Sequence, residues 1–178
     1  MWKEFRPAFR FLFVFVGLYL AGNVLYGLWI ESYDTLPDPA TSAVTIQTSG
    51  ILNLLGQATT VTENTQGPTV LLSNDSKVIL SVYEGCNGIN VMIVFVAFLA
   101  AFGGSIKKMS WFLPAGIILI HLSNLARLVL LYFVAVGYQH YFYYVHKYVF
   151  TAIIYVMVFA LWIMWVKING QQREAKVV

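Results

Sequence analysis

The stretch FLFVFVGLYLAGNVLYGLWI, residues 11–30, decides the fold class, because it runs for 20 residues without a charged side chain. A helix rises about 1.5 Å per residue, so about 20 apolar residues cross a hydrocarbon core of about 30 Å. Basic residues precede the stretch, as in a signal peptide, but it is long and aromatic and no small-residue cleavage site follows. We therefore interpret Phe11–Ile30 as an uncleaved membrane anchor.

Further apolar stretches follow along the chain, and composition supports the same fold class. They are Gly85–Gly104, Trp111–Val136 and Val145–Val166, with aromatic residues at several ends. The chain is 59% hydrophobic and 11% charged, against about 25% charged residues in a soluble domain. The sequence predicts an all-α integral membrane protein, a single domain over residues 1–178 with about four transmembrane helices.

The basic residues predict the orientation of these helices. They fall in three groups, which four spans would place on one side of the membrane: Lys3, Arg6 and Arg10; Lys107 and Lys108; Lys167, Arg173 and Lys176. Cytoplasmic loops carry an excess of Lys and Arg, so we expect both termini in the cytoplasm and the chain in the cell inner membrane. The net charge of +3 is too small to indicate a nucleic-acid partner.

The segment 31–84 between the first two spans is too long for a simple connector and is expected to be an extracytoplasmic α+β insertion. Asp38 followed by Pro39 is typical of a helix start. A roughly apolar stripe then predicts a short helix on the membrane surface, ending near Gly56. The stripe consists of Ala40, Ala43, Val44, Ile51, Leu52 and Leu55. Turn-rich separators then predict a small meander of three strands, Thr59–Glu63, Thr69–Leu72 and Lys77–Tyr83.

Arg127 is the residue that a membrane tolerates least. It lies about 24 Å along the helix that starts at Trp111, inside the outer part of the hydrocarbon layer. A charge in a span costs about 2.5–3.5 kcal/mol, so it normally faces a partner or a cavity. The simpler alternative is that Arg127 extends outward to water or pairs with a loop carboxylate such as Glu84.

Cys86 lies where a predicted strand ends and the second span begins, in Glu84-Gly85-Cys86-Asn87-Gly88. A single cysteine in a membrane protein is commonly an inert, small apolar residue. A helix N-terminus, however, lowers the pKa of a thiol, and its free N–H groups can bind an oxyanion. We therefore expect a reactive thiol at this turn.

His146 opens the last span at the same outer level as Cys86 and Arg127. A lone histidine at the membrane interface is more often an anchor than a catalyst. His121 lies deeper and on another face, and His140 lies in the outer loop, so both are weaker candidates. The shared depth of three reactive side chains from separate helices is the informative observation.

These residues, in this order, resemble the exosortase/archaeosortase family of membrane cysteine transpeptidases. The resemblance is carried by Glu84-Gly85-Cys86-Asn87-Gly88-Ile89, by Asn124-Leu125-Ala126-Arg127 and by His146, and covers about Val78 to Tyr155. The chain length and the long outer segment before the cysteine look like the short exosortase F type. Many members have Ser where this chain has Asn87, and a Gly-Trp pair where it has Val149-Phe150; most are also longer.

The resemblance implies catalytic roles for Cys86, Arg127 and His146. Cys86 would be the nucleophile, His146 the base and then the acid, and Arg127 the group that stabilises the oxyanion. Asn87 and Gly88 would support the turn, with N–H groups near Asn87 also facing the oxyanion, and Asn124 would orient Arg127. No cofactor or metal is implied.

The expected partners are exported proteins with a C-terminal sorting signal, which consists of a motif, a transmembrane helix and a basic tail. Membrane lipid surrounds the chain, and an accessory membrane protein is a further possible partner. The active site is expected to face away from the cytoplasm.

Several other classes of membrane protein fit the sequence less well. A lipoprotein signal peptidase needs two aspartates at the membrane, and no predicted span contains one. A thiol–quinone oxidoreductase needs paired cysteines, and a haem-binding bundle needs histidines paired at one depth. The serious alternative is a non-enzymatic membrane subunit or transporter component with a structural Arg127 and a silent Cys86.

Overall fold

A computed structural model describes residues 2–174, with side chains described for residues 5–169. Of the basic residues used above to predict orientation, Lys176 lies outside the described residues, as do the side chains of Lys3 and Arg173. The chain divides into two compact units. The helical unit comprises the chain before Leu28, Ile89–Ile120 and the chain after Ile154; the mixed unit comprises Leu28–Gly88 and His121–Ile154.

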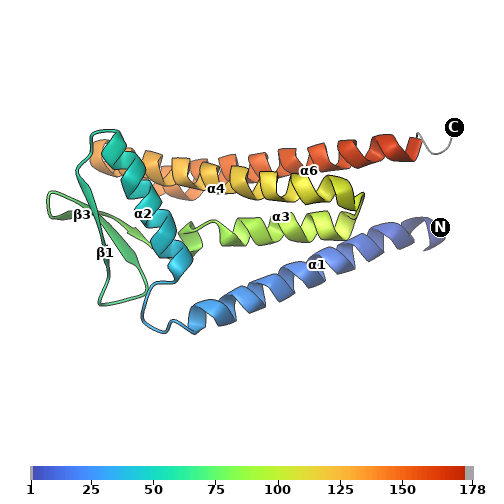
Figure 1. Ribbon diagram of the computed structural model, residues 1–178, viewed down its shortest axis with the longest axis horizontal. Helices are drawn as coiled ribbons and strands as arrows, with labels where there is room; N and C mark the ends of the chain where they lie inside the picture. The colour runs from blue at the N-terminus through green and yellow to red at the C-terminus, as the bar shows by residue number, and fades with distance from the viewer. Residues whose placement is uncertain (1, 175–178) are drawn as a thin grey trace. The chain divides into compact units, whose positions relative to one another are not determined.

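Long apolar helices confirm that the chain is an α-helical membrane protein (Figure 1). They are α1 (Trp2–Glu31), α4 (Ile106–Gly137) and α6 (Phe150–Glu174). Within the described residues, three segments are long and apolar enough to cross a membrane: Phe5–Glu31, Ile106–Gly137 and Gln139–Asn169. The last of these includes the residues that lead into α6.

The helix α3 (Ile89–Phe102) is shorter than the predicted span Gly85–Gly104. Gly88, at φ +85°, precedes it, and Gly103 and Gly104, at φ +70° and +136°, follow it, so the backbone leaves the helical region at both ends. Its 14 residues are about 21 Å long, less than the hydrocarbon thickness of about 30 Å. By length, therefore, α3 is not a fourth full span.

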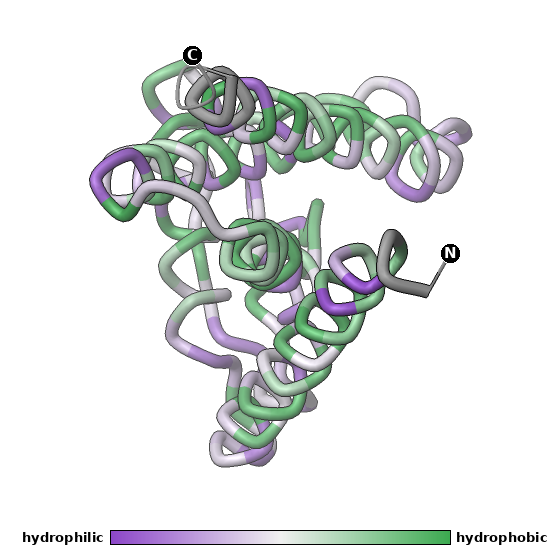
Figure 2. Tube along the Cα trace, turned by 90° about the vertical axis from the view of Figure 1, so that its right-hand side faces the viewer, coloured by the Kyte–Doolittle hydropathy of each residue, from purple (hydrophilic) through white to green (hydrophobic). Residues whose placement is uncertain are grey.

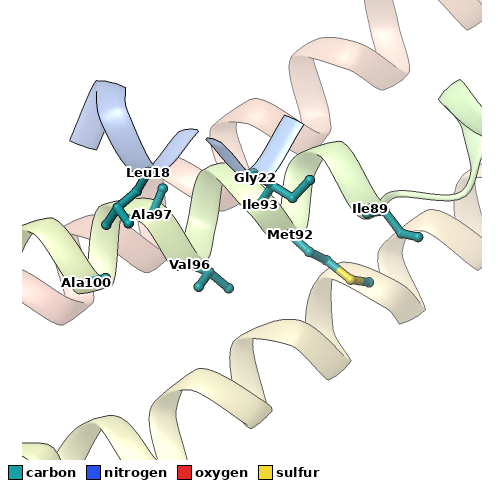
Figure 3. Close-up of a pocket in the computed structure, with 8 residues that line it drawn as sticks. All are labelled: Leu18, Gly22, Ile89, Met92, Ile93, Val96, Ala97 and Ala100. Carbon is teal, nitrogen blue, oxygen red and sulfur yellow. The ribbon is translucent and has the colours of Figure 1, made fainter. Parts of the chain in front are cut away.

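The helical unit is held together by large apolar and aromatic side chains. Its buried core contains Phe95, Leu99, Phe112, Ile120, Val158, Leu161 and Trp165. Figure 2 shows its helices as mostly hydrophobic turns. A groove between α1 and α3 is lined by apolar residues (Figure 3): Leu18, Gly22, Ile89, Met92, Ile93, Val96, Ala97 and Ala100. Since none of these side chains has a reactive polar group, the chemistry must come from elsewhere.

The mixed unit contains the predicted meander, with strands β1 (Thr59–Glu63), β2 (Val70–Asn74) and β3 (Lys77–Val82) paired antiparallel in that order. The strand predicted at Thr69–Leu72 extends to Asn74. Asp75 and Ser76 both have positive φ, 47° and 65°, so the turn to β3 takes only two residues. The predicted separator Ser73–Ser76 was therefore too long.

The helix α2 (Pro39–Leu54) begins as predicted, because Asp38 caps it and Pro39 occupies its first turn. It packs against β1 and β2 (Figure 1). Of the predicted apolar stripe, however, only Val44 and Leu52 are buried. The other residues of the buried face carry hydroxyls: Thr41, Thr45, Thr48 and Ser49. The predicted apolar stripe is therefore not the face that α2 buries within the protein.

Candidate active site

The structure brings Cys86, Arg127 and His146 together, and all three belong to the mixed unit. Cys86 ends the single 3-10 turn η1 (Glu84–Cys86), which follows β3. Arg127 and Asn124 lie on α4. His146 lies in the π-helix η3 (Val145–Val149) at the start of the last span. Three elements distant in sequence thus converge on one point.

The turn that carries Cys86 is closed by hydrogen bonds from its own backbone amides. Cys86 N–H donates to the Tyr83 carbonyl at 2.8 Å, and Asn87 N–H donates to the Glu84 carbonyl at 3.4 Å. The sequence predicts that N–H groups near Asn87 face an oxyanion. In this structure the Asn87 amide already donates to the Glu84 carbonyl, so it does not face an oxyanion site in this arrangement.

Asn124 holds the cysteine rather than the arginine. Its Nδ2 donates to the Cys86 carbonyl oxygen at 2.8 Å, and the side chain is 1% exposed. Gly88 packs against it, because a Cβ built there would lie 3.3 Å from Asn124 Cγ. Among the described residues, neither Asn124 Oδ1 nor Arg127 Nε has a hydrogen-bond partner, so no hydrogen bond from Asn124 Oδ1 orients Arg127.

His146 contacts both other candidate residues through one nitrogen. Its Nε2 lies 3.9 Å from Cys86 Sγ and 3.3 Å from a terminal nitrogen of Arg127. A guanidinium only donates hydrogen bonds, so Nε2 must be the acceptor in this contact and must carry no proton. His146 is therefore neutral in this arrangement, with its proton on Nδ1. The lone pair of Nε2 lies within reach of the thiol.

The π-helix η3 sets the direction of the imidazole. A π turn contains more residues than an α turn and is found often at functional sites. The His146 ring stacks on Phe142, with 5.8 Å between ring centroids and 11° between planes. The apolar contact fixes the face of the ring and leaves its edge for Cys86 and Arg127.

The electrostatics of Cys86 differ from the sequence prediction. Burial raises the pKa of the Cys86 thiol above its usual value, and the Arg127 guanidinium and hydrogen bonds with Tyr83 only partly oppose this. The side chain is 4% exposed. Cys86 also precedes Gly88 and α3 and does not occupy the first turn of an α-helix. Burial therefore favours the protonated thiol, in place of the lowered pKa that the sequence predicts.

Tyr83 is a component of the site that the sequence analysis missed. Its ring lies over Gly85, where an added Cβ would come within 3.1 Å of the phenol oxygen and closer still to the ring. A negative charge on Cys86, when its thiol ionises, and burial of the phenol raise the pKa of Tyr83, so its hydroxyl stays a donor. Nothing in the sequence distinguished this tyrosine from the many interfacial aromatics.

The remaining histidines lie apart from this chemistry. His121 Nε2 pairs with Gln47 Oε1 at 2.7 Å, and the His140 ring contacts Tyr141. Among the residues that the structure describes, no three His, Cys, Asp or Glu side chains are grouped so as to bind a metal ion.

Comparison with known proteins identifies a family for the sequence. The family model described as transmembrane exosortase matches residues 5–166, which is most of the chain. Neither the curated proteins nor the solved structures gave a match. The matched range includes Cys86, Asn124, Arg127 and His146.

Proposed function

The chain belongs to the transmembrane exosortase family, and from this we propose that it is a membrane-embedded cysteine protease or transpeptidase. The observation that supports the proposal is the shared contact of His146 Nε2 with Cys86 Sγ, at 3.9 Å, and with Arg127, at 3.3 Å. A nucleophile, a base with an unprotonated ring nitrogen and a cation for the oxyanion are the groups that acyl transfer needs.

The proposed reaction begins from a neutral cysteine–histidine pair. Cys86 Sγ attacks the carbonyl carbon of a substrate peptide bond while its proton moves to His146 Nε2. Protonated Nε2 can no longer accept from Arg127, so the guanidinium turns its N–H groups to the new oxyanion. The C–N bond then breaks, His146 returns the proton to the leaving amine, and the acyl group remains on Cys86 as a thioester.

The second half of the reaction releases the acyl group. An amine acceptor or a water molecule gives a proton to His146 and attacks the thioester carbon. The C–S bond breaks and Cys86 regains its proton. Transfer to an amine makes the chain a transpeptidase, whereas water makes it a protease.

The proposed substrates are exported proteins with a C-terminal motif, a transmembrane helix and a basic tail. A substrate of this form presents its scissile bond just outside the hydrocarbon layer, at the level inferred for Cys86. An accessory membrane protein is a further proposed partner. Within the family, the insertion before Cys86 favours the short exosortase F type.

We further propose that α3 crosses the membrane as a fourth, short span. Its 14 residues, Ile89–Phe102, are all uncharged, and all are apolar except Asn90 in the first turn. A short apolar helix is accommodated by local thinning of the bilayer or by packing among longer helices. Four spans place both termini in the cytoplasm of an inner-membrane protein and the insertion 31–84 outside.

One observation favours the alternative, a non-enzymatic membrane subunit. Cys86 is 4% exposed, and burial raises the pKa of its thiol, as in a structural cysteine. The contact of Cys86 with His146, which in turn contacts Arg127, favours the enzyme, because an inert cysteine needs neither.

The deciding experiment coexpresses the chain with an exported protein that ends in such a sorting signal. Processing is followed by the mass of the substrate in membranes. Cys86→Ala and His146→Ala should abolish processing at unchanged protein levels, and Cys86→Ser should keep a trace at most, since an alkoxide is much harder to form than a thiolate. Normal processing by Cys86→Ala would refute the peptidase and favour the membrane subunit.

A further inference from the structure

A chain of buried hydrogen bonds connects the start of α2 to the residue after the cysteine. Asn87 Nδ2 donates to Thr41 Oγ1 at 3.1 Å, and the Thr41 hydroxyl donates to Asp38 Oδ2 at 2.5 Å. Asp38 Oδ1 accepts from the backbone amides of Ala40 and Thr41 at 2.9 and 3.0 Å. Asn87, Thr41 and Asp38 are 2%, 0% and 3% exposed, so these hydrogen bonds lie in the interior of the mixed unit.

The chemistry of the three groups fixes the direction of the chain. An ionised carboxylate can only accept, so the Thr41 hydroxyl must donate its proton to Asp38. The lone pairs of Thr41 then face Asn87, which must present its NH₂ group and not its carbonyl. These hydrogen bonds therefore set which way the Asn87 side-chain amide faces. Reversing that amide would place two acceptors against each other in a buried site.

The same turn is held from its other side by α4. Asn124 Nδ2 binds the Cys86 carbonyl, while Thr41 binds the side chain of the next residue, Asn87. Two adjacent residues are thus anchored to two different helices. Neither anchor touches Cys86 Sγ, which leaves the sulfur for His146.

We propose that Thr41 and Asp38 are positioning residues for the nucleophile, acting through Asn87 to hold the turn Glu84–Gly88 so that Cys86 Sγ lies against His146. This role rests on the proposed peptidase function. A cap such as Asp38 would be expected at the start of α2 in any case, but a cap alone does not explain the bonds that Thr41 makes to both Asp38 and Asn87. The insertion is therefore part of the catalytic apparatus and not only a cover over it.

The test uses Thr41→Val, which removes the hydroxyl at nearly constant volume. The matched control is Thr48→Val, because Thr48 is 2% exposed on the same face of α2 and its hydroxyl donates to the Val44 carbonyl of its own helix. Thr41→Ser restores the hydroxyl and serves as the rescue. Each variant is assayed in membranes for kcat and KM of processing, and for the rate at which a small alkylating reagent modifies Cys86.

A displacement of the reacting atom by about 1 Å costs about 100-fold in rate, so Thr41→Val should lower kcat by about 10- to 100-fold. KM should change little, because substrate binding is not altered. Alkylation of Cys86 should become faster, since a loosened turn exposes a thiol that is 4% exposed in the native state. Thr48→Val and Thr41→Ser should resemble the unmodified chain in all three measurements.

Equal effects of Thr41→Val and Thr48→Val on kcat and on alkylation would overturn the proposal, as would additive effects of Thr41→Val and Asn87→Ala. The alkylation rate does not depend on turnover. If Cys86→Ala processes normally, the peptidase function fails, while faster alkylation of Thr41→Val would still show that the hydroxyl holds the turn.

Discussion

Alanine substitutions at Gly88 and Gly56 separate the effect of packing at the turn Glu84–Gly88 from the effect of backbone strain. Both have positive φ, +85° and +83°, which costs an L-residue about 1–2 kcal/mol. A Cβ at Gly88 would lie 3.3 Å from Asn124 Cγ and 3.4 Å from its Nδ2, whereas a Cβ at Gly56 would meet nothing within 4 Å. Alanine at the two positions therefore carries the same backbone penalty and a different contact.

The difference between the two variants can be estimated from the Asn124 hydrogen bond. To admit the Cβ, Asn124 must move by a few tenths of an ångström, which lengthens its bond of 2.8 Å to the Cys86 carbonyl. A buried hydrogen bond contributes about 0.5–1.5 kcal/mol. Gly88→Ala should therefore destabilise the chain by about 0.5–1.5 kcal/mol more than Gly56→Ala.

Both variants would be unfolded by titration with a denaturing detergent, and processing would be measured on the folded fraction. Gly88→Ala should also slow processing by about tenfold or more, because the carbonyl of the nucleophile shifts, while Gly56→Ala should not. Equal stability and equal processing in the two variants would refute the conclusion that the Gly88–Asn124 contact holds the turn.

The remaining predictions concern the reacting groups and the topology. Arg127→Lys should insert and fold but lose about 10²–10³-fold in processing, since Lys offers no planar fork; near-normal processing would make Arg127 a structural charge. Alkylation of Cys86 against pH should have its midpoint above the usual thiol pKa of about 8.5, because burial raises this pKa; Arg127→Gln removes a charge that lowers the pKa and should move the midpoint higher. A midpoint below pH 7 would contradict the burial. Tyr83→Phe removes a hydrogen bond that lowers the pKa of Cys86, so the midpoint should again rise and processing should slow by up to about tenfold, whereas an unchanged profile would place the hydroxyl outside the site. Reporter fusions after Thr65 and at the C-terminus should report opposite compartments, and matching compartments would contradict four spans.

The insertion shows what a hydropathy pattern can and cannot predict. Strand β1 was predicted at its observed bounds, because turn residues define both of its ends. The start of α2 was predicted from Asp38 and Pro39, but its buried face was not. Thr45 and Thr48 donate to carbonyls of their own helix at 2.8 Å, and hydroxyls satisfied in this way can be buried. A scale that counts threonine as polar does not show this.

The proximity of Cys86, Arg127 and His146 was predicted from the sequence, but Tyr83 and the electrostatics of the site were not. Depth along a helix follows from length, so the common level of Cys86, Arg127 and His146 was accessible from the sequence. The burial of a side chain and the direction in which it points depend on neighbours that are distant in sequence. Asn124 bonds to Cys86, and burial raises the pKa of the thiol, because the turn packs between two helices. Neither follows from local spacing.

The π-helix at Val145–Val149 changes the rotation of His146 relative to the helix α6 that follows it. Each residue of an α-helix advances about 100° around the axis, so one additional residue shifts the rotational phase of everything on one side of it. The direction of the His146 side chain can therefore differ from the direction that a continuous α-helix with α6 would give it. Loss of one residue between His146 and Phe150 would turn the imidazole by about 100° relative to α6, although every side chain named in the site would still be present.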